Sequence, residues 1–503
     1  MRSASAELPK APGALPVTAF LARPWLVPAG AAVASALVFT LVSGHLIDDT
    51  YITLSYAKNL AFHGHWGLIE DGTANTATSP LNVLLLGFVT FIVRDAIFAA
   101  GIVFVASQVA FALGLRRLGA ATGLSAGFAP LAVGLLLVNP LLLSSVGLEV
   151  ALGGAAVIWL MVFLRERRPA AAGAVIGLIA LIRIDLLLIA FVLFLARREF
   201  WAGIWRMTFA ALAVMLPWFV FSWLVLGSAV PDTLVVKIMQ RSWGTFSFTN
   251  GPLLYLQNFP VAATLSFLPL VIGGLAGLLW TFHYRRDSDL AKRLLPFATL
   301  AIAGAAHYLA YCWLNVPPYH WYYAPSIIGA TVFLAAGVCA IPGRARLGAG
   351  ALAGVFLVVG IVAYAAPELP RRFAPITSNH ASTDEYRQIG AQLAALTQGR
   401  KVESAGEVGA LAYACDCDIV DQFSDRGSVD PAILETKSRS SDLGKALLEA
   451  NFRFFDHSVP PATPDLILTA GGKVPPANAL AAWTISTPWM GMGKQNLYLL
   501  PAR

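Results

Sequence analysis

The chain has 503 residues, of which 57% are hydrophobic and 13% charged, and its mean hydropathy is +0.68. This composition excludes an ordinary soluble globular protein and predicts a membrane protein that crosses the bilayer many times. The net charge of +7 does not indicate nucleic-acid binding, because the Lys and Arg residues lie in short clusters between apolar runs instead of forming one basic face.

The N-terminal segment, residues 1–24, carries Arg2, Lys10 and Arg23 and precedes an apolar run over 25–45. That run is about twenty residues long, which is the length of a membrane span, and it lacks a convincing cleavage site. We therefore predict a retained first transmembrane helix with a cytoplasmic segment before it.

An adjacent acidic pair, Asp48 and Asp49, opens the first external loop, residues 46–95, directly after this span. Two carboxylates at the edge of a bilayer repel each other and lie where apolar groups are preferred. A helix beginning near Tyr51 needs only one acid as a cap, so the pair predicts a chemical role for at least one of them. We assign the role of general base to Asp48, with Asp49 orienting an acceptor, binding a metal or capping the helix.

A transmembrane domain over residues 25–366 is predicted to contain eleven spans. The run 81–93 is short and is followed by Arg94 and Asp95, so we expect an interfacial helix there. The stretch 171–196 is interrupted by Arg183 and Asp185 and predicts two short helices that meet at these charges. The other spans are expected near 96–115, 125–143, 148–164, 204–226, 259–282, 294–313, 320–341 and 347–366. The basic clusters between spans then lie on the side of the N-terminus, which the positive-inside rule identifies as the cytoplasm.

Five ionisable side chains lie at turns or in loops on the opposite, outward side: Glu149, Arg183, Asp185, Lys237 and His320. Glu149 either caps a helical turn or belongs to a site, and Arg183 and Asp185 either pair with each other or contact a ligand. Lys237 is either a lysine that snorkels to the headgroups or a site residue. His320 belongs either to an aromatic interface belt or to a binding site.

The tail, residues 367–503, has a different composition from the spans. A helical pattern near Asp384–Leu396, a β-like run over Lys401–Tyr413 and another near Asp465–Leu468 predict a small α/β domain outside the membrane. Cys415 and Cys417 lie in this tail, and their spacing is poor for zinc without further ligands, so we expect a disulfide or two thiols.

The outward charges are suited to transfer from a lipid-linked phosphosugar. A carboxylate can take the proton of an attacking hydroxyl, while Arg or Lys neutralises a phosphate leaving group. Carboxylates and a phosphate can also recruit Mg, Mn or Ca, although no spacing compels a metal. The sequence contains no phosphate loop, zinc motif or nucleotide fingerprint in a strand-to-helix context, which argues against a cytoplasmic nucleotide-using enzyme.

Several motifs along the chain carry a family resemblance. They are Asp48-Asp-Thr-Tyr-Ile-Thr-Leu-Ser-Tyr-Ala-Lys-Asn-Leu, His63-Gly-His, Thr78-Ser-Pro-Leu, Gly147-Leu-Glu149, Leu181-Ile-Arg-Ile-Asp185, Pro231-Asp-Thr-Leu-Val-Val-Lys237, Gly406-Glu-Val-Gly-Ala-Leu-Ala-Tyr and Ile419-Val-Asp421. In this order they resemble bacterial GT-C glycosyltransferases, and in particular the mycobacterial terminal arabinofuranosyltransferases and their uncharacterised relatives. The chain departs from the family pattern at Arg183-Ile-Asp185, where Arg-Pro-Asp is usual, and at Pro231-Asp232, where Pro-Asn is usual.

The resemblance implies a multi-pass glycosyltransferase of the bacterial inner membrane, with a polyprenyl-phosphate sugar as donor. The sugar is arabinofuranose or another pentose or hexose, and the acceptor is a cell-envelope glycan, lipid or protein on the outer face. Asp48 or Asp49 is then the base, and the donor cleft is formed by Glu149, Arg183, Asp185, Lys237 and His320. Residues expected to line the substrate are Tyr51, Thr78, Ser79 and Tyr319.

Two functions from other classes use the same outward charges. A transporter or flippase of lipid-linked sugars predicts charges distributed through the membrane depth and repeat symmetry between two halves, and the sequence shows neither. A scaffold for envelope assembly predicts that alanine substitution of the outward charges is tolerated. We therefore favour the glycosyltransferase.

Overall fold

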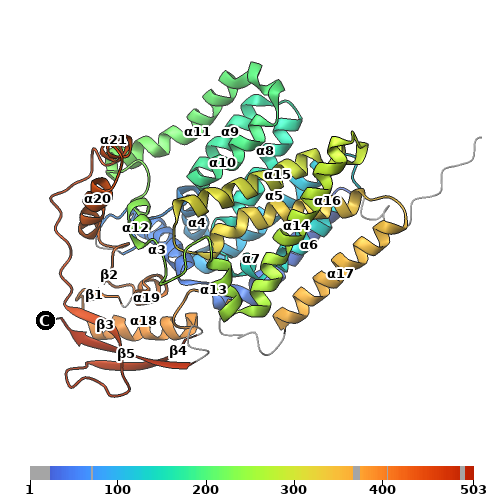
Figure 1. Ribbon diagram of the computed structural model, residues 1–503. Coiled ribbons are helices and arrows are strands. Elements are labelled where there is room, and N and C mark those ends of the chain that lie inside the picture. Colours follow the sequence, from blue (N-terminus) through green and yellow to red (C-terminus); the bar gives the residue numbers. More distant parts are fainter. Residues whose placement is uncertain (1–22, 70–71, 366–373, 405, 488–492, 503) are drawn as a thin grey trace, which may run out of the picture.

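The computed structural model describes residues 23–69, 72–365, 374–404, 406–487 and 493–502. Nearly all of the N-terminal segment predicted to be cytoplasmic, and the predicted domain boundary between 366 and 367, lie outside these residues. Figure 1 shows a large bundle of helices with a small sheet and its own helices at one end.

Seven of the described helices are long and apolar enough to cross a membrane. They are α2 (Leu26–Val42), α5 (Ala96–Ala121), α11 (Ile204–Val225), α14 (Pro260–Arg285), α15 (Asp289–Leu314), α16 (Ala324–Ala340) and α17 (Arg344–Ala365). Helices of this kind satisfy their backbone hydrogen bonds internally, as a hydrocarbon environment requires. The chain is therefore a multi-pass membrane protein.

Shorter apolar helices complete the bundle. They are α4 (Pro80–Val93), α6 (Phe128–Leu137), α7 (Pro140–Ser144), α8 (Val150–Arg165), α9 (Pro169–Ile182) and α10 (Leu187–Leu195). All eleven segments predicted to span the membrane are helical, and whether the shorter ones cross it stays a prediction. The predicted break at Arg183 is confirmed, because its backbone is extended between α9 and α10.

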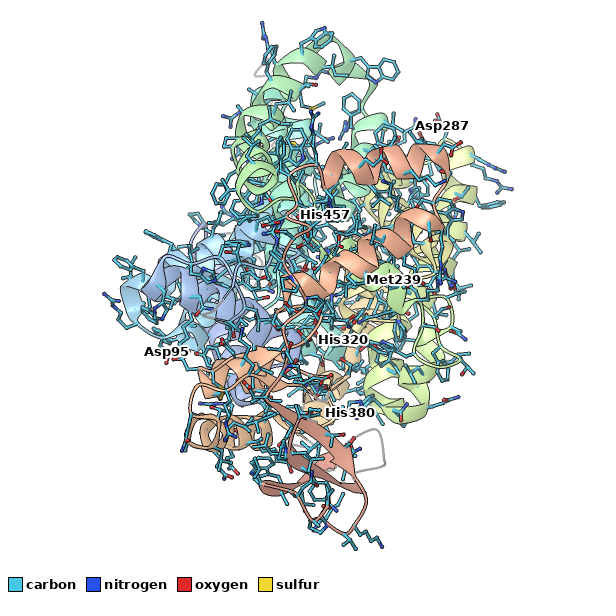
Figure 2. All side chains as sticks on the ribbon, turned by 90° about the vertical axis from the view of Figure 1, so that its left-hand side faces the viewer. Asp95, Met239, Asp287, His320, His380 and His457 are labelled. Carbon is cyan, nitrogen blue, oxygen red and sulfur yellow. A yellow bond between two sulfur atoms is a disulfide. The ribbon has the colours of Figure 1, made fainter. Side chains whose placement is uncertain are left out.

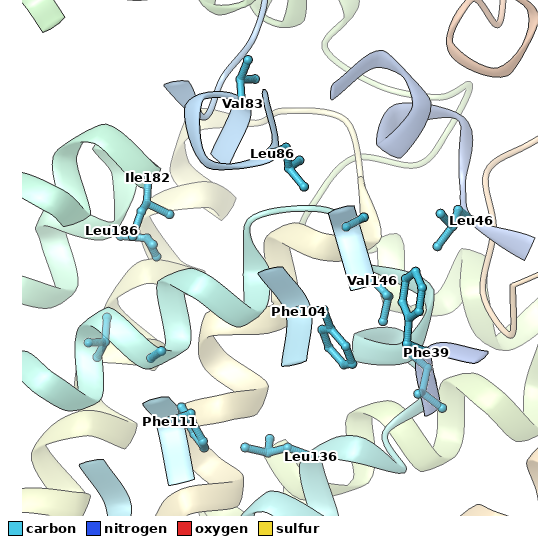
Figure 3. Close-up of a cluster of buried hydrophobic side chains, with 14 of the residues drawn as sticks. Phe39, Leu46, Val83, Leu86, Phe104, Phe111, Leu136, Val146, Ile182 and Leu186 are labelled. Atoms are coloured by element: carbon cyan, nitrogen blue, oxygen red, sulfur yellow. The ribbon is translucent and has the colours of Figure 1, made fainter. Parts of the chain in front are cut away.

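Small residues let the helices of the bundle approach closely. A Cβ added to Gly173 or Gly177 of α9 would overlap the backbone of α11. Large side chains fill the remaining space, as Figure 3 shows for Phe39 of α2, Phe104 of α5 and Val146, which lies between α7 and α8. Close packing of this kind holds membrane helices together where lipid is as apolar as the helix surface.

The C-terminal part contains a five-stranded mixed sheet in the order β2-β1-β3-β5-β4. The strands are β1 (Val402–Glu403), β2 (Ile419–Val420), β3 (Leu466–Gly471), β4 (Ala481–Thr487) and β5 (Gly493–Pro501), and the helices are α18 (Thr383–Thr397), α19 (Gly409–Cys415), α20 (Val429–Ser438) and α21 (Asp442–Asn451). Strand β1 is parallel to β2 and β3, whereas β5 is antiparallel to β3 and β4. The predicted helix near Asp384–Leu396 and strand near Asp465–Leu468 are confirmed.

The predicted β-like run over Lys401–Tyr413 is wrong beyond Glu403, because helix α19 begins at Gly409. Its Gly-Ala-Leu-Ala-Tyr-Ala sequence is short and rich in good helix formers, and a distant carboxylate caps its first turn. Cys415 and Cys417 form a disulfide at its end.

Contacts between helices attach the C-terminal part to the helical bundle. Helix α19 packs on α3 (Asp48–His63), the helix that the acidic pair begins, and α20 packs on α12 (Thr233–Gln240). The α3 contact includes an ion pair of 2.8 Å between Lys58 and Asp416. The loop over residues 46–95 and the C-terminal part thus lie side by side.

Candidate active site

Asp48 joins the first loop to the C-terminal part. Its carboxylate accepts hydrogen bonds from the backbone N–H groups of Val408, Gly409 and Ala410 at 3.2, 2.9 and 2.7 Å. These groups lie at the start of α19, where backbone donors lack partners within the helix. Burial raises the pKa of Asp48, and the three N–H groups oppose that shift. Both oxygens of Asp48 are therefore committed to holding α19.

Asp49 is only partly buried and opens into a cleft of about 540 Å³, which we call the polar cleft. Its main polar lining residues are Asp48, Asp49, Gln240, Tyr319, His380, Glu407 and Asp421. Burial raises the pKa of Asp49 to about 6, with the positive charge of Lys237 opposing this rise and Asp48 adding to it. No other residue in the described part of the chain donates a hydrogen bond to the Asp49 carboxylate, so it remains available to a ligand.

The C-terminal part supplies two more carboxyl groups to the polar cleft. Burial and the nearby charge of Asp48 raise the pKa of Glu407 well above its ordinary value, while the Glu407 oxygens accept the His380 N–H at 2.9 and 3.1 Å. Burial also raises the pKa of Asp421 to about 6. Figure 2, which faces this end of the molecule, shows His380 near the C-terminal sheet. A cleft with several carboxyl groups is suited to binding hydroxyl groups.

Lys237 of α12 lies among aromatic rings next to this cleft. Its Nζ is 4.1 Å from the centroid of the Tyr319 ring and 5.5 Å from that of Trp321, and it donates to the Tyr322 hydroxyl at 3.1 Å. Burial lowers the pKa of Lys237, but Tyr322, Tyr319 and Asp49 outweigh burial and hold the pKa above its ordinary value. Lys237 is therefore a partly buried ammonium group that is charged at neutral pH.

A second cleft of about 290 Å³, which we call the lysine cleft, lies on the other side of this group. Its lining includes Thr78, Arg183, Asp185, Thr233, Leu234, Lys237, Ile238, Tyr311, Leu314 and Tyr322. Tyr319 lines the polar cleft and also stacks under Lys237, so this ring stands between the two clefts. Asp49 on one side and Lys237 on the other interact electrostatically across that boundary.

Arg183 lies in a cluster of charged and polar side chains that satisfy one another, which we call the arginine cluster: Glu149, Arg183, Asp185, His307 and Tyr311. Arg183 donates to Asp185 and to Glu149, each at 2.8 Å, and to the Tyr311 hydroxyl at 2.9 Å. His307 lies 2.8 Å from Asp185 through Nε2. The alternative that Arg183 and Asp185 pair with each other is thus confirmed, and His307 is a member that sequence reasoning missed.

The remaining predicted residues are only partly brought together. Thr78 lines the lysine cleft and Tyr319 the polar cleft. Within the described chain, neither Tyr51 nor Ser79 lines either cleft: Tyr51 is buried with its ring 5.2 Å from that of Tyr413, and Ser79 is buried at the start of α4. His320 is likewise buried, with its ring 5.0 Å from Trp321.

No group of three or more His, Cys, Asp or Glu side chains arranged to hold a metal ion occurs in the described residues. The sequence left open a divalent cation without requiring one, and a bound phosphate can contribute oxygen ligands of its own.

No protein-family model matches the sequence, and comparison with curated proteins gives no match either. The fold is similar to the crystal structure of ArnT from Cupriavidus metallidurans bound to undecaprenyl phosphate, with a TM-score of 0.55 at 14% identity over 95% of this chain and 98% of that chain. The apo form of ArnT gives a TM-score of 0.55 at 13% identity over 93% and 97%. The chain has the GT-C fold.

This GT-C fold is also similar to the arabinofuranosyltransferase AftD from Mycobacteria, with a TM-score of 0.50 at 16% identity. The match covers 96% of this chain but only 40% of AftD, so the chain corresponds to part of that larger protein. At these identities the likeness concerns the fold, and the activity of this protein has to be argued from its own clefts.

Proposed function

We propose that the protein is a glycosyltransferase that moves a sugar from a polyprenyl-phosphate donor to a cell-envelope glycan, lipid or protein. The observation that carries this proposal is the arrangement of Asp49 and Lys237 at the boundary of two clefts. One cleft presents an available carboxylate among hydroxyl-binding groups, and the other presents a partly buried cation. The structurally similar proteins support the same class of reaction, since one is named an arabinofuranosyltransferase and another was crystallised with undecaprenyl phosphate.

The lysine cleft is suited to the lipid phosphate of the donor. Lys237 has one hydrogen bond from its ammonium group, whereas Arg183 already binds two carboxylates and a tyrosine hydroxyl. We therefore assign Lys237 as the phosphate ligand and Arg183 as a positioning residue. Leu234, Ile238 and Leu314 line the same cleft and are also exposed on the molecular surface, which gives a polyprenyl chain an apolar exit toward the bilayer.

The polar cleft is suited to the acceptor, with Asp49 as the base. An acceptor hydroxyl attacks the anomeric carbon, and Asp49 takes its proton as the new C–O bond forms. The bond from the anomeric carbon to the phosphate oxygen breaks, and the lipid phosphate leaves with the electron pair, stabilised by Lys237. Because the pKa of Asp49 is about 6, its carboxylate is ionised at neutral pH and can accept the proton. Asp48 holds α19, and with it Glu407, at the rim of the cleft.

The positive-inside rule supports placing these clefts on the outer face of the bacterial cytoplasmic membrane. Basic residues such as Arg116, Arg165, Arg197 and Arg285 lie at the ends of helices α5, α8, α10 and α14. Both clefts lie at the other end of the bundle, where α3 and α12 contact α19 and α20 of the C-terminal part. A nucleotide sugar in the cytoplasm would not reach them.

Turnover of a synthetic polyprenyl-phosphate sugar by purified protein tests this proposal. Transfer releases one lipid phosphate for each sugar moved to the acceptor, whereas a flippase leaves the donor intact. We expect Asp49→Asn to lower the transfer rate by about 10²–10⁴-fold, as loss of a general base does. The matched variant Asp48→Asn should retain more activity, with both proteins shown to be folded by size-exclusion chromatography. Full activity in Asp49→Asn would overturn the mechanism.

A further inference from the structure

Helix α21 has two faces of different character. Leu448 is buried in a small core with Val235 of α12 and with Ile433 of α20. On the other side, Leu443 is 72% exposed and Leu447 63% exposed. Exposed Ala446 and Ala450 continue this face at the helical spacings i, i+3, i+4 and i+7, so a single stripe of apolar side chains runs along α21.

The stripe leads to the end of a membrane span. The Nε1 of Trp223, near the end of α11, donates to the backbone oxygen of Ala450 at 2.8 Å, and the Trp223 ring lies 5.0 Å from that of Phe454. Phe454 follows Ala450 by four residues and is itself 45% exposed. Figure 1 shows α21 at this end of α11. The stripe of α21 therefore meets α11 where that span leaves the hydrocarbon.

The apolar surface continues from α21 onto α11. Phe221, Leu224 and Val225 are exposed on α11, as expected for a helix that faces lipid. Tryptophan is enriched at the membrane–water interface, which matches the place of Trp223. Charged groups border the stripe instead of interrupting it, because Glu449 pairs with Lys437 and Lys445 with Asp442. An apolar stripe with charged borders is typical of a helix that lies in the plane of a bilayer.

We propose that α21 is an in-plane membrane anchor, with Leu443, Leu447 and Phe454 inserted into the lipid leaflet at the Val225 end of α11. The continuity with α11 identifies lipid as the occupant of this surface. Helix α12 packs against the same small core through Val235, which lies two residues before Lys237. The anchor thus fixes the depth of Lys237 relative to the bilayer surface.

Spin labels on the full-length protein in lipid nanodiscs, with one copy in each disc, test this anchor. Free Cys312 and Cys339 are replaced by Ser, and a nitroxide is attached at Leu443→Cys or Leu447→Cys. Glu449→Cys is the matched control, because it lies on the same helix two residues away on the charged border. Collision rates with oxygen, which concentrates in lipid, and with a water-soluble nickel chelate give the environment of each label.

We expect the oxygen-to-nickel ratio at positions 443 and 447 to exceed that at position 449 several-fold. Equal ratios at all three positions would overturn the proposal by placing the stripe in water. Low collision rates with both reagents at 443 and 447 would also overturn it, because they would show that protein covers the stripe.

Discussion

The arginine cluster and the Asp49–Lys237 pair contain the same kinds of side chain but differ in what they leave unsatisfied. In the arginine cluster, Arg183 is held between Glu149 and Asp185 at 2.8 Å from each. Asp49 and Lys237 act on each other electrostatically while each faces a cleft. Charges that satisfy one another hold helices together, whereas charges with spare capacity can bind or react. We therefore expect the reaction to take place at Asp49 and Lys237, whose charges are not fully satisfied by other side chains.

The largest effect is expected from opening the arginine cluster. Arg183→Met leaves the buried Glu149 and the partly buried Asp185 carboxylates without their cation, which costs about 3 kcal/mol in free energy of unfolding. Denaturation in mixed micelles measures this loss. Arg183→Lys is the control, since it keeps the charge but loses the forked geometry. If Arg183→Met were as stable as the wild type but inactive, Arg183 would act in the reaction together with Asp49 and Lys237.

Removing the cation of the Asp49–Lys237 pair should lower the activity strongly and the stability little, which is the reverse of the effect at Arg183. We expect Lys237→Met to lower kcat/KM by about 10²–10³-fold, because the leaving phosphate loses its charge partner, while the unfolding midpoint changes little. Lys58→Met provides a matched comparison, since Lys58 pairs with Asp416 on the surface and away from the clefts. Equal rates for the two variants would place phosphate binding elsewhere.

The ionised carboxylate of Asp49 is expected to destabilise the folded protein, although the reaction requires it. Because burial raises the folded-state pKa from 3.8 to about 6, folded Asp49 binds its proton more tightly than unfolded Asp49 does. Stability then falls as pH rises from about 4 to about 6 and stays lower above that range. Asp49→Asn should thus be more stable than the wild type above pH 6, by on the order of 3 kcal/mol, with no difference below pH 4. Denaturation curves across this pH range measure the gain, and a loss of stability at pH 8 would contradict it.

The smallest effect is expected at Asp48, which behaves as a structural group beside a functional one. Asp48→Asn keeps one acceptor for the first turn of α19 but removes the charge, so we expect a loss of about 1 kcal/mol. Amide hydrogen exchange of α19 should quicken in this variant and remain unchanged in Asp49→Asn. Faster exchange in Asp49→Asn would show that both acids hold the contact between α3 and α19.

Much of the helical bundle follows from the sequence, because apolar runs of spanning length and clusters of basic residues are local signals. The break at Arg183 was also predictable, since two charges interrupt an apolar run. The strand expected over residues 404–413 fails because the cap of α19 comes from Asp48, about 360 residues away in the chain.

The candidate site shows the same limit. The importance of the acidic pair was visible, but adjacent residues of a helix point in different directions, and only the docking of α19 determines which of the two carboxylates keeps its oxygens available in the cleft. Glu407 and Asp421 reach the polar cleft through the fold of the C-terminal part, so no local pattern near Asp49 could reveal them. His307 completes the arginine cluster from within the apolar helix α15, where a single histidine gives little signal.

The most direct test of the account is the pH dependence of kcat/KM for sugar transfer by the wild-type protein. With Asp49 as the base, the account predicts a rate that rises tenfold per pH unit at low pH and levels off above an apparent pKa near 6. Asp48→Asn should keep this profile at a changed maximal rate. A profile that is flat between pH 5 and pH 8, or whose acidic limb disappears in Asp48→Asn, would contradict the assignment of Asp49.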